Sequence, residues 1–178
     1  MKPLMIGRYC LATDAIASLC MAFFFCLFLC LETQGSESPE TTNPARRTVS
    51  VPGHIPWTDT GLDVVEGQTV YFRAVGSVSL QKGNPVAYCG PSGYNLQTVQ
   101  QPIQKRNLGA LIGKVYLLIS VEEDPETGEE IRNELSQLFY IGPENRIIMP
   151  LQGRLFLGVN ENLVQDNGGM FEVVILQD

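Results

Sequence analysis

From about Val51 onward the chain is built of short runs in which apolar and polar residues alternate. In Thr69–Val75 and Phe171–Ile175 a mostly apolar set of positions opposes a more polar one, the period of a strand that buries one face. Glycine, proline and asparagine interrupt these runs at short intervals, and no long helical period is present. The expected strands are Leu62–Val65, Thr69–Ser79, Ala110–Val121, Leu138–Ile141, Arg146–Met149, Gly153–Val159 and Met170–Leu176. The pattern predicts an all-β domain over residues 51–178, a two-sheet antiparallel β-sandwich.

The densest acidic segment is Glu122–Glu130. It lacks the spaced Asp and Asn ligands and the terminal Glu of an EF-hand calcium loop. Pro125 and Gly128 lie near its centre. We therefore expect the solvated tip of a long hairpin that joins Val115–Val121 to Ile131–Tyr140.

An uncharged apolar segment, Ala15–Leu31, follows Lys2 and Arg8. Its length lies between that of a signal-peptide core and that of a membrane-spanning helix, so residues 1–35 are predicted to be a signal peptide or a signal anchor. Thr33 and Gly35 offer small residues suited to cleavage. Both alternatives send the rest of the chain across a membrane, and we expect a protein that is secreted, periplasmic or anchored by this segment.

Residues 36–50 are poor in apolar side chains and rich in Ser, Thr, Pro and Glu. A segment of this composition cannot bury a core, so it is predicted to be a disordered linker. The 178 residues then leave room for one domain.

The formal net charge of −7, from 12 Lys and Arg against 19 Asp and Glu, offers no field that would attract phosphates. Nucleic acid is therefore not expected as a partner, and a neutral ligand or a cation is favoured. The sequence is compatible with a homo-oligomer but does not specify one.

Residues suited to catalysis are scarce. Four of the five cysteines lie in or beside the apolar segment, which leaves Cys89 without a disulfide partner and predicts a small buried residue. The single histidine, His54, lies between Gly53 and Pro56 and is expected in a surface turn. The spacing does not support a Cys89–His54 pair, and no nucleophile-elbow, zinc-protease, P-loop or dinucleotide motif is present. We expect a protein that is not an enzyme.

An oxygen-rich segment, Gly158–Gly169, precedes the last predicted strand. Calcium takes six to eight oxygen ligands, and Glu161 and Asp166 would supply two negative charges. The same residue types are common in hairpins, and Asp166–Gly169 would also form an ordinary turn. Composition leaves both readings open.

A series of landmarks in order resembles one known family. They are Trp57-x-x-Thr60-Gly61, Gly67-x-x-Val70, Ala74-x-Gly76, Gly90-Pro91-x-Gly93, Gly109–Gly113, Ile141-Gly142, Gly153-x-Leu155-x-Leu157–Glu161 and Asp166-Asn167-x-Gly169-x-Phe171. Together they resemble the bacterial PA-I-like galactophilic, calcium-dependent lectins over about Trp57 to Leu176. The resemblance implies a galactose-binding-domain-like jelly roll, in which calcium sits in the loop before the last strand and coordinates sugar hydroxyls.

Carried over by position, the resemblance implies a ligand set for Ca²⁺. Glu161 stands where the family has Asp, and Asp166 and Asn167 stand where it has a side-chain pair. Backbone carbonyls near Val164 and at about Leu80 would complete the site.

The implied sugar contacts are Gln97, which stands where the family has His, together with Asn160 and Asn162. The function expected is that of an exported lectin-like module that binds glycans through calcium. The alternative is a non-catalytic structural or interaction sandwich with a degenerate metal site.

Overall fold

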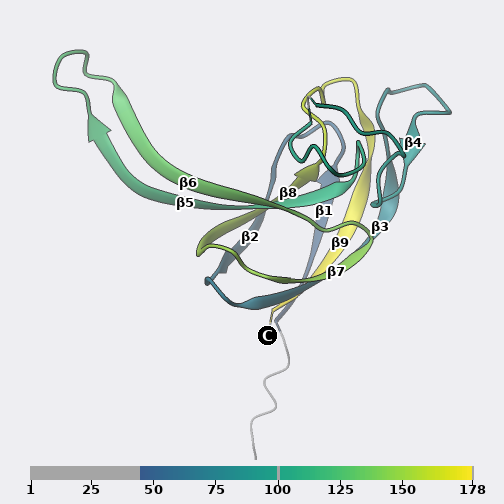
Figure 1. Ribbon diagram of the computed structural model, residues 1–178, viewed down its shortest axis with the longest axis horizontal. Coiled ribbons are helices and arrows are strands. Elements are labelled where there is room, and N and C mark those ends of the chain that lie inside the picture. Colours follow the sequence, from purple (N-terminus) through teal and green to yellow (C-terminus); the bar gives the residue numbers. More distant parts are fainter. Residues whose placement is uncertain (1–44, 100, 178) are drawn as a thin grey trace, which may run out of the picture. The chain divides into compact units, whose positions relative to one another are not determined.

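The computed structural model describes residues 45–99 and 101–177, which lie in one compact unit, Asn43–Asp178. Its regular elements are strands that form two antiparallel sheets, and this confirms the predicted two-sheet antiparallel sandwich (Figure 1). The strands are β1 (Ala45–Pro52), β2 (Thr58–Val64), β3 (Thr69–Ser79), β4 (Tyr88–Cys89), β5 (Leu111–Glu123), β6 (Glu130–Tyr140), β7 (Glu144–Ile148), β8 (Gly153–Val159) and β9 (Gly168–Gln177).

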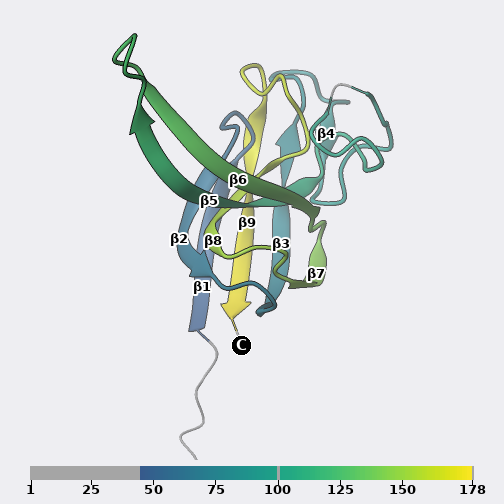
Figure 2. The same cartoon turned by 60° about the vertical axis from the view of Figure 1, so that its left-hand side comes forward.

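One sheet has the order β1-β9-β3-β4, with β7 also paired to β3, and the other has the order β2-β8-β5-β6. The last strand, β9, is therefore central, between β1 and β3. Its pairing with β3 runs from Val70 opposite Gln177 to Ser79 opposite Gly168. Figure 2 shows the long yellow β9 between β1 and β3, with the loop that precedes it at the upper end of the sandwich.

Alternation along the central strands makes the core. On β3, Val70 and Phe72 are fully buried, and on β9 Phe171, Val173 and Ile175 are fully buried, whereas the residues that alternate with them are more exposed. They pack with Leu155 of β8 and other apolar residues of the second sheet. Each such side chain contributes about 1.5–3 kcal/mol when removed from water, so this layer supplies most of the free energy that holds the sheets together.

The first strand corrects the predicted boundary of the domain. Residues 45–50, expected in a disordered linker over 36–50, belong to β1 and pair with β9 from Ala45 opposite Gln177 onward. The polar composition concealed a short alternation in which Val49 and Val51 face the core while Thr48 and Ser50 are exposed. Pairing with an existing strand supplies backbone hydrogen bonds that composition does not register.

The predicted long hairpin is confirmed. β5 and β6 pair from Ile112 opposite Tyr140 to Glu123 opposite Glu130, and the acidic residues between them form its exposed tip. Figure 1 shows this hairpin curving away from the sandwich on the side opposite β4. In the described part of the chain, no helix is long and apolar enough to cross a membrane. The predicted signal peptide or signal anchor, residues 1–35, lies outside the described residues.

Candidate functional site: the β8–β9 loop and the adjoining pocket

The loop between β8 and β9 covers residues 160–167 and is held against two other segments. The Lys82 amide, in the turn after β3, donates to the Asp166 carbonyl over 2.6 Å. The Gly53 amide donates to the Gly169 carbonyl over 3.0 Å. The first of these contacts places the predicted ligand loop beside the turn that follows Leu80.

Asn167 is the central polar residue of this loop. It is 3% exposed, and its backbone amide donates to the Val164 carbonyl over 3.1 Å. Its side-chain Nδ2 donates to Glu161 Oε2 over 2.6 Å and to the Gly53 carbonyl over 3.3 Å. Its Oδ1 is buried and has no hydrogen-bond partner among the described residues. A buried acceptor without a partner costs about 1–3 kcal/mol, so this oxygen marks a place where a ligand would be stabilising.

Glu161 is half-buried beside Asn167. Burial raises the pKa of the Glu161 carboxyl above its ordinary value, the hydrogen bond from Asn167 acts against this rise, and the negative charge of Asp166 adds to it. The dominant cause is desolvation, which disfavours the charged form. A cation close to this carboxylate would relieve that penalty.

The other residues implied as ligands take different positions. The Val164 side chain is buried, and its carbonyl accepts one hydrogen bond, which leaves a second lone pair. Asp166 is exposed. Leu80 is partly buried, and its amide donates to the Ala87 carbonyl over 2.9 Å. Within residues 45–99 and 101–177 no three His, Cys, Asp or Glu side chains cluster as metal ligands, so an ion held here would depend on amide and backbone oxygens as well.

Asn160, predicted to contact the sugar, instead holds two backbone segments together. It is fully buried, and its Oδ1 accepts from the Ile103 amide over 2.8 Å. Its Nδ2 donates to the carbonyls of Ile103 and Asn107 over 3.0 and 3.1 Å. The side chain is a clamp that fastens the segment 101–107 to the start of the β8–β9 loop. Asn162, the other implied contact on this loop, is exposed.

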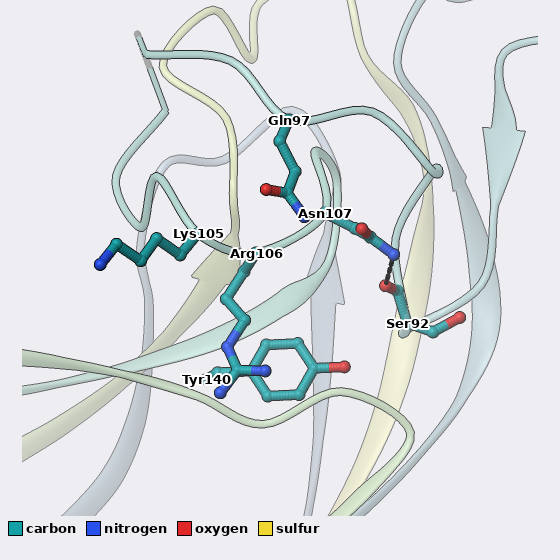
Figure 3. Close-up of a pocket in the computed structure, with 6 residues that line it drawn as sticks. All are labelled: Ser92, Gln97, Lys105, Arg106, Asn107 and Tyr140. Carbon is teal, nitrogen blue, oxygen red and sulfur yellow. Dashed lines mark hydrogen bonds between the residues drawn. The ribbon is translucent and has the colours of Figure 1, made fainter.

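Gln97, the third implied sugar contact, is exposed and lines a pocket of about 130 Å³ (Figure 3). The Arg106 guanidinium lies over the Tyr140 ring, 4.5 Å from its centroid, and the Lys105 chain extends away from it. The Asn107 side chain donates to the Ser92 carbonyl over 3.1 Å. The pocket is lined by side chains able to donate hydrogen bonds, namely those of Ser92, Gln97, Lys105, Arg106, Asn107 and Tyr140.

Two residues hold the backbone around this pocket in place, and the sequence pointed to only one of them. Gly93, in the Gly-Pro-x-Gly landmark, has a positive φ of 80°, and a Cβ there would come within 2.8 Å of the Leu108 carbonyl. Gln101 is 3% exposed, and its side chain accepts from the Thr98 amide and donates to the Ile103 and Arg106 carbonyls. Nothing near Gln101 in the sequence distinguishes it from an exposed glutamine.

The two residues weighed for catalysis lie as predicted. His54 is exposed in a turn. Cys89 is 8% exposed, and burial raises the pKa of its thiol to about 11, so the thiolate is scarce at neutral pH. Cys89 is a packed core residue, as expected from the sequence.

Of the comparisons with known proteins, only the one with solved structures found a match, and it supports the fold. No family model matches the chain, and no curated protein matches it in sequence. Among solved structures, the chain is similar to the N-terminal domain of EclA, described as a PllA-like lectin, with a TM-score of 0.52 and 17% sequence identity. The match covers 74% of this chain and 96% of that domain. The chain therefore has the fold of a lectin β-sandwich domain.

Proposed function

We propose that this chain is an exported carbohydrate-binding module in which the loop before β9 holds a calcium ion that coordinates sugar hydroxyls. The observation that carries the proposal is the buried Oδ1 of Asn167, which has no partner among the described residues and belongs to the same side chain that holds Glu161. The structural likeness to a lectin domain supports carbohydrate as the ligand class.

The residues of the loop fit a hard cation. Calcium is bound by carboxylate, amide and backbone carbonyl oxygens, and the loop offers all three kinds within seven residues. Glu161, Asp166 and Asn167 would hold the ion through their side chains, and Val164 and Leu80 would do so through their carbonyls. The charges of Glu161 and Asp166 repel each other, and a divalent cation that attracts both carboxylates would offset that repulsion.

A bound calcium supplies an electrophilic centre to which neighbouring hydroxyls of a sugar bind in place of water. The protein supplies the remaining contacts. Gln97 and Asn107 present amide groups at the adjoining pocket, and the Asn160 clamp joins the pocket segment to the start of the loop. A neutral sugar rich in hydroxyls could accept from these donors without a deep cavity.

Calorimetric titration of the protein with Ca²⁺ tests the metal part of this proposal. We expect saturable heat of binding and a rise in melting temperature that EDTA reverses. Absence of both heat and stabilisation at millimolar calcium contradicts it. A glycan array probed with and without chelator tests the sugar part, and binding that chelator leaves unchanged contradicts the role of the ion.

The second candidate is a structural or interaction sandwich whose metal site has degenerated. It is favoured by the amide orientation of Asn167, whose Nδ2 rather than an oxygen faces Glu161, and by the presence of only two carboxylates in the loop. It predicts that Asp166→Ala melts like the wild type with and without calcium. A calcium-dependent loss of stability in that variant argues against it.

A further inference from the structure

The hairpin formed by β5 and β6 exposes apolar side chains in a part that does not pack on the sandwich. Beyond Tyr116, β5 pairs only with β6, because its pairing with β8 ends at that residue. Figures 1 and 2 both show the distal half of the hairpin extending away from the two sheets. A two-stranded hairpin is marginally stable in water unless a third strand or a packed face supports it.

Both faces of this distal segment expose large apolar side chains. Ile131 and Leu135 lie on the face that continues the core side, at 46% and 50% exposure. Leu118 and Val121 lie on the other face, at 44% and 48% exposure. Single exposed apolar residues are ordinary, but a group of them on a projecting hairpin marks a surface that another chain covers.

The outer edge of β6 is open to pairing. Within the described residues no strand pairs with that edge, since β6 ends the order β2-β8-β5-β6. Glu130–Tyr140 contains neither proline nor lysine, the residues that commonly block such edges, and the one register shift of the hairpin lies in β5. The backbone amides and carbonyls of β6 can therefore extend the sheet by one strand.

We propose that β6 pairs with β6 of a second copy of this chain, antiparallel and centred on Asn133. Two-fold symmetry requires directly opposed residues to lie on the same face, so only registers centred on a residue are allowed. Centring on Arg132 opposes two arginines, and centring on Glu134 opposes two glutamates. Centring on Leu135 places no charged residue opposite another. Centring on Ile131 opposes Glu130 and Arg132 but pairs only residues 130–132 of β6.

The register centred on Asn133 differs from these four because it combines opposite charges with a longer ladder that pairs residues 130–136 of β6. It sets Arg132 opposite Glu134 of the partner and Ile131 opposite Leu135 of the partner, each pair twice by symmetry. Among the residues that the structure describes, the ion pair of Arg132 is with Glu130 at 3.1 Å; both side chains are well exposed, so this ion pair has little strength. Charge complementarity and the length of the ladder together thus select a second copy and one register.

Sedimentation equilibrium of the full-length chain tests the proposal. The wild type is expected to form a dimer, and Arg132→Glu or Glu134→Arg alone, which each oppose like charges twice, should weaken dimerisation about tenfold. Mixing the two single variants in equal amounts should restore dimers, because each then opposes unlike charges. The double variant Arg132→Glu/Glu134→Arg should also dimerise like the wild type.

A matched control is Arg73→Glu, which makes the same charge change on an exposed residue of the other sheet and should leave the dimer unchanged. Recovery on mixing shows that each single variant is folded. A wild type that stays monomeric over the accessible concentrations overturns the proposal. So does association that both single substitutions leave intact, which would place the contact elsewhere in the chain or with a different partner.

Discussion

The beginning and the end of the β8–β9 loop each bury an asparagine, and the two residues use their amides in opposite ways. Asn160 satisfies both ends of its amide with backbone groups of the segment 101–107. Asn167 donates through Nδ2 but leaves Oδ1 buried without a partner among the described residues. Equal burial therefore does not imply an equal role. The completed amide is structural, and the incomplete one is where a ligand is expected.

The largest effect expected is that of Asn160→Ala. It removes three hydrogen bonds to partly buried backbone groups, and we expect a loss of about 3 kcal/mol in the free energy of unfolding. Urea denaturation with and without calcium measures it, and the loss should be the same in both. Asn95→Ala, at an exposed position of the neighbouring loop, is the matched control and should change stability by less than about 0.5 kcal/mol.

Asn167→Ala should abolish stabilisation by calcium. Calcium at a hundred times its dissociation constant stabilises a binding protein by about 2.7 kcal/mol, and this variant should lose that increment. Thermal melts in calcium and in EDTA measure the increment directly. Asn160→Ala should keep the increment although it is the less stable protein. A full calcium increment in Asn167→Ala would contradict the assigned difference between the two residues.

Glu161→Gln should give a smaller effect of opposite sign in the absence of calcium. Because the folded state raises the pKa of this carboxyl, folding opposes its ionisation, and stability is lost as the pH rises through the folded pKa. The glutamine variant avoids that loss, so in EDTA it should be more stable than the wild type at pH 7. The difference should vanish below pH 4.5, the ordinary value for the carboxyl. Calcium should stabilise only the wild type.

The smallest effect expected is that of Gln97→Ala. The side chain is exposed, so stability should stay within about 0.5 kcal/mol of the wild type. Loss of one hydrogen bond to a sugar should weaken binding about fivefold for the glycan that the array identifies as bound best. Unchanged affinity for that glycan would remove the pocket from the sugar-binding surface and restrict binding to the loop.

The strands were predictable because their signal is local. Alternation along Thr69–Ser79 and Gly153–Val159 located β3 and β8 with the bounds that the structure has. β1 was missed because only Val49 and Val51 carry its pattern, and β4 because it has two residues. These two strands depend on pairing with β9 and β3, distant in sequence, which no local pattern reports.

The candidate site was predictable only in part. The run of oxygen-bearing residues pointed to the β8–β9 loop, but it did not separate Asn160 from Asn167. That distinction depends on Ile103 and Asn107, more than fifty residues away, and on whether their backbone groups reach the amide. The structural role of Gln101 could not be predicted either. A glutamine whose side chain holds a loop together cannot be distinguished in the sequence from a glutamine exposed to solvent.

The clamp made by Asn160 reads only the main chain of the segment it holds. Side chains between Gln101 and Asn107 can therefore be exchanged without loosening the anchorage, provided that the backbone path is kept. The side chains of this part of the pocket can therefore vary while its backbone stays anchored. A library randomised at Lys105 and Arg106 would vary ligand recognition and leave the fold of the domain intact.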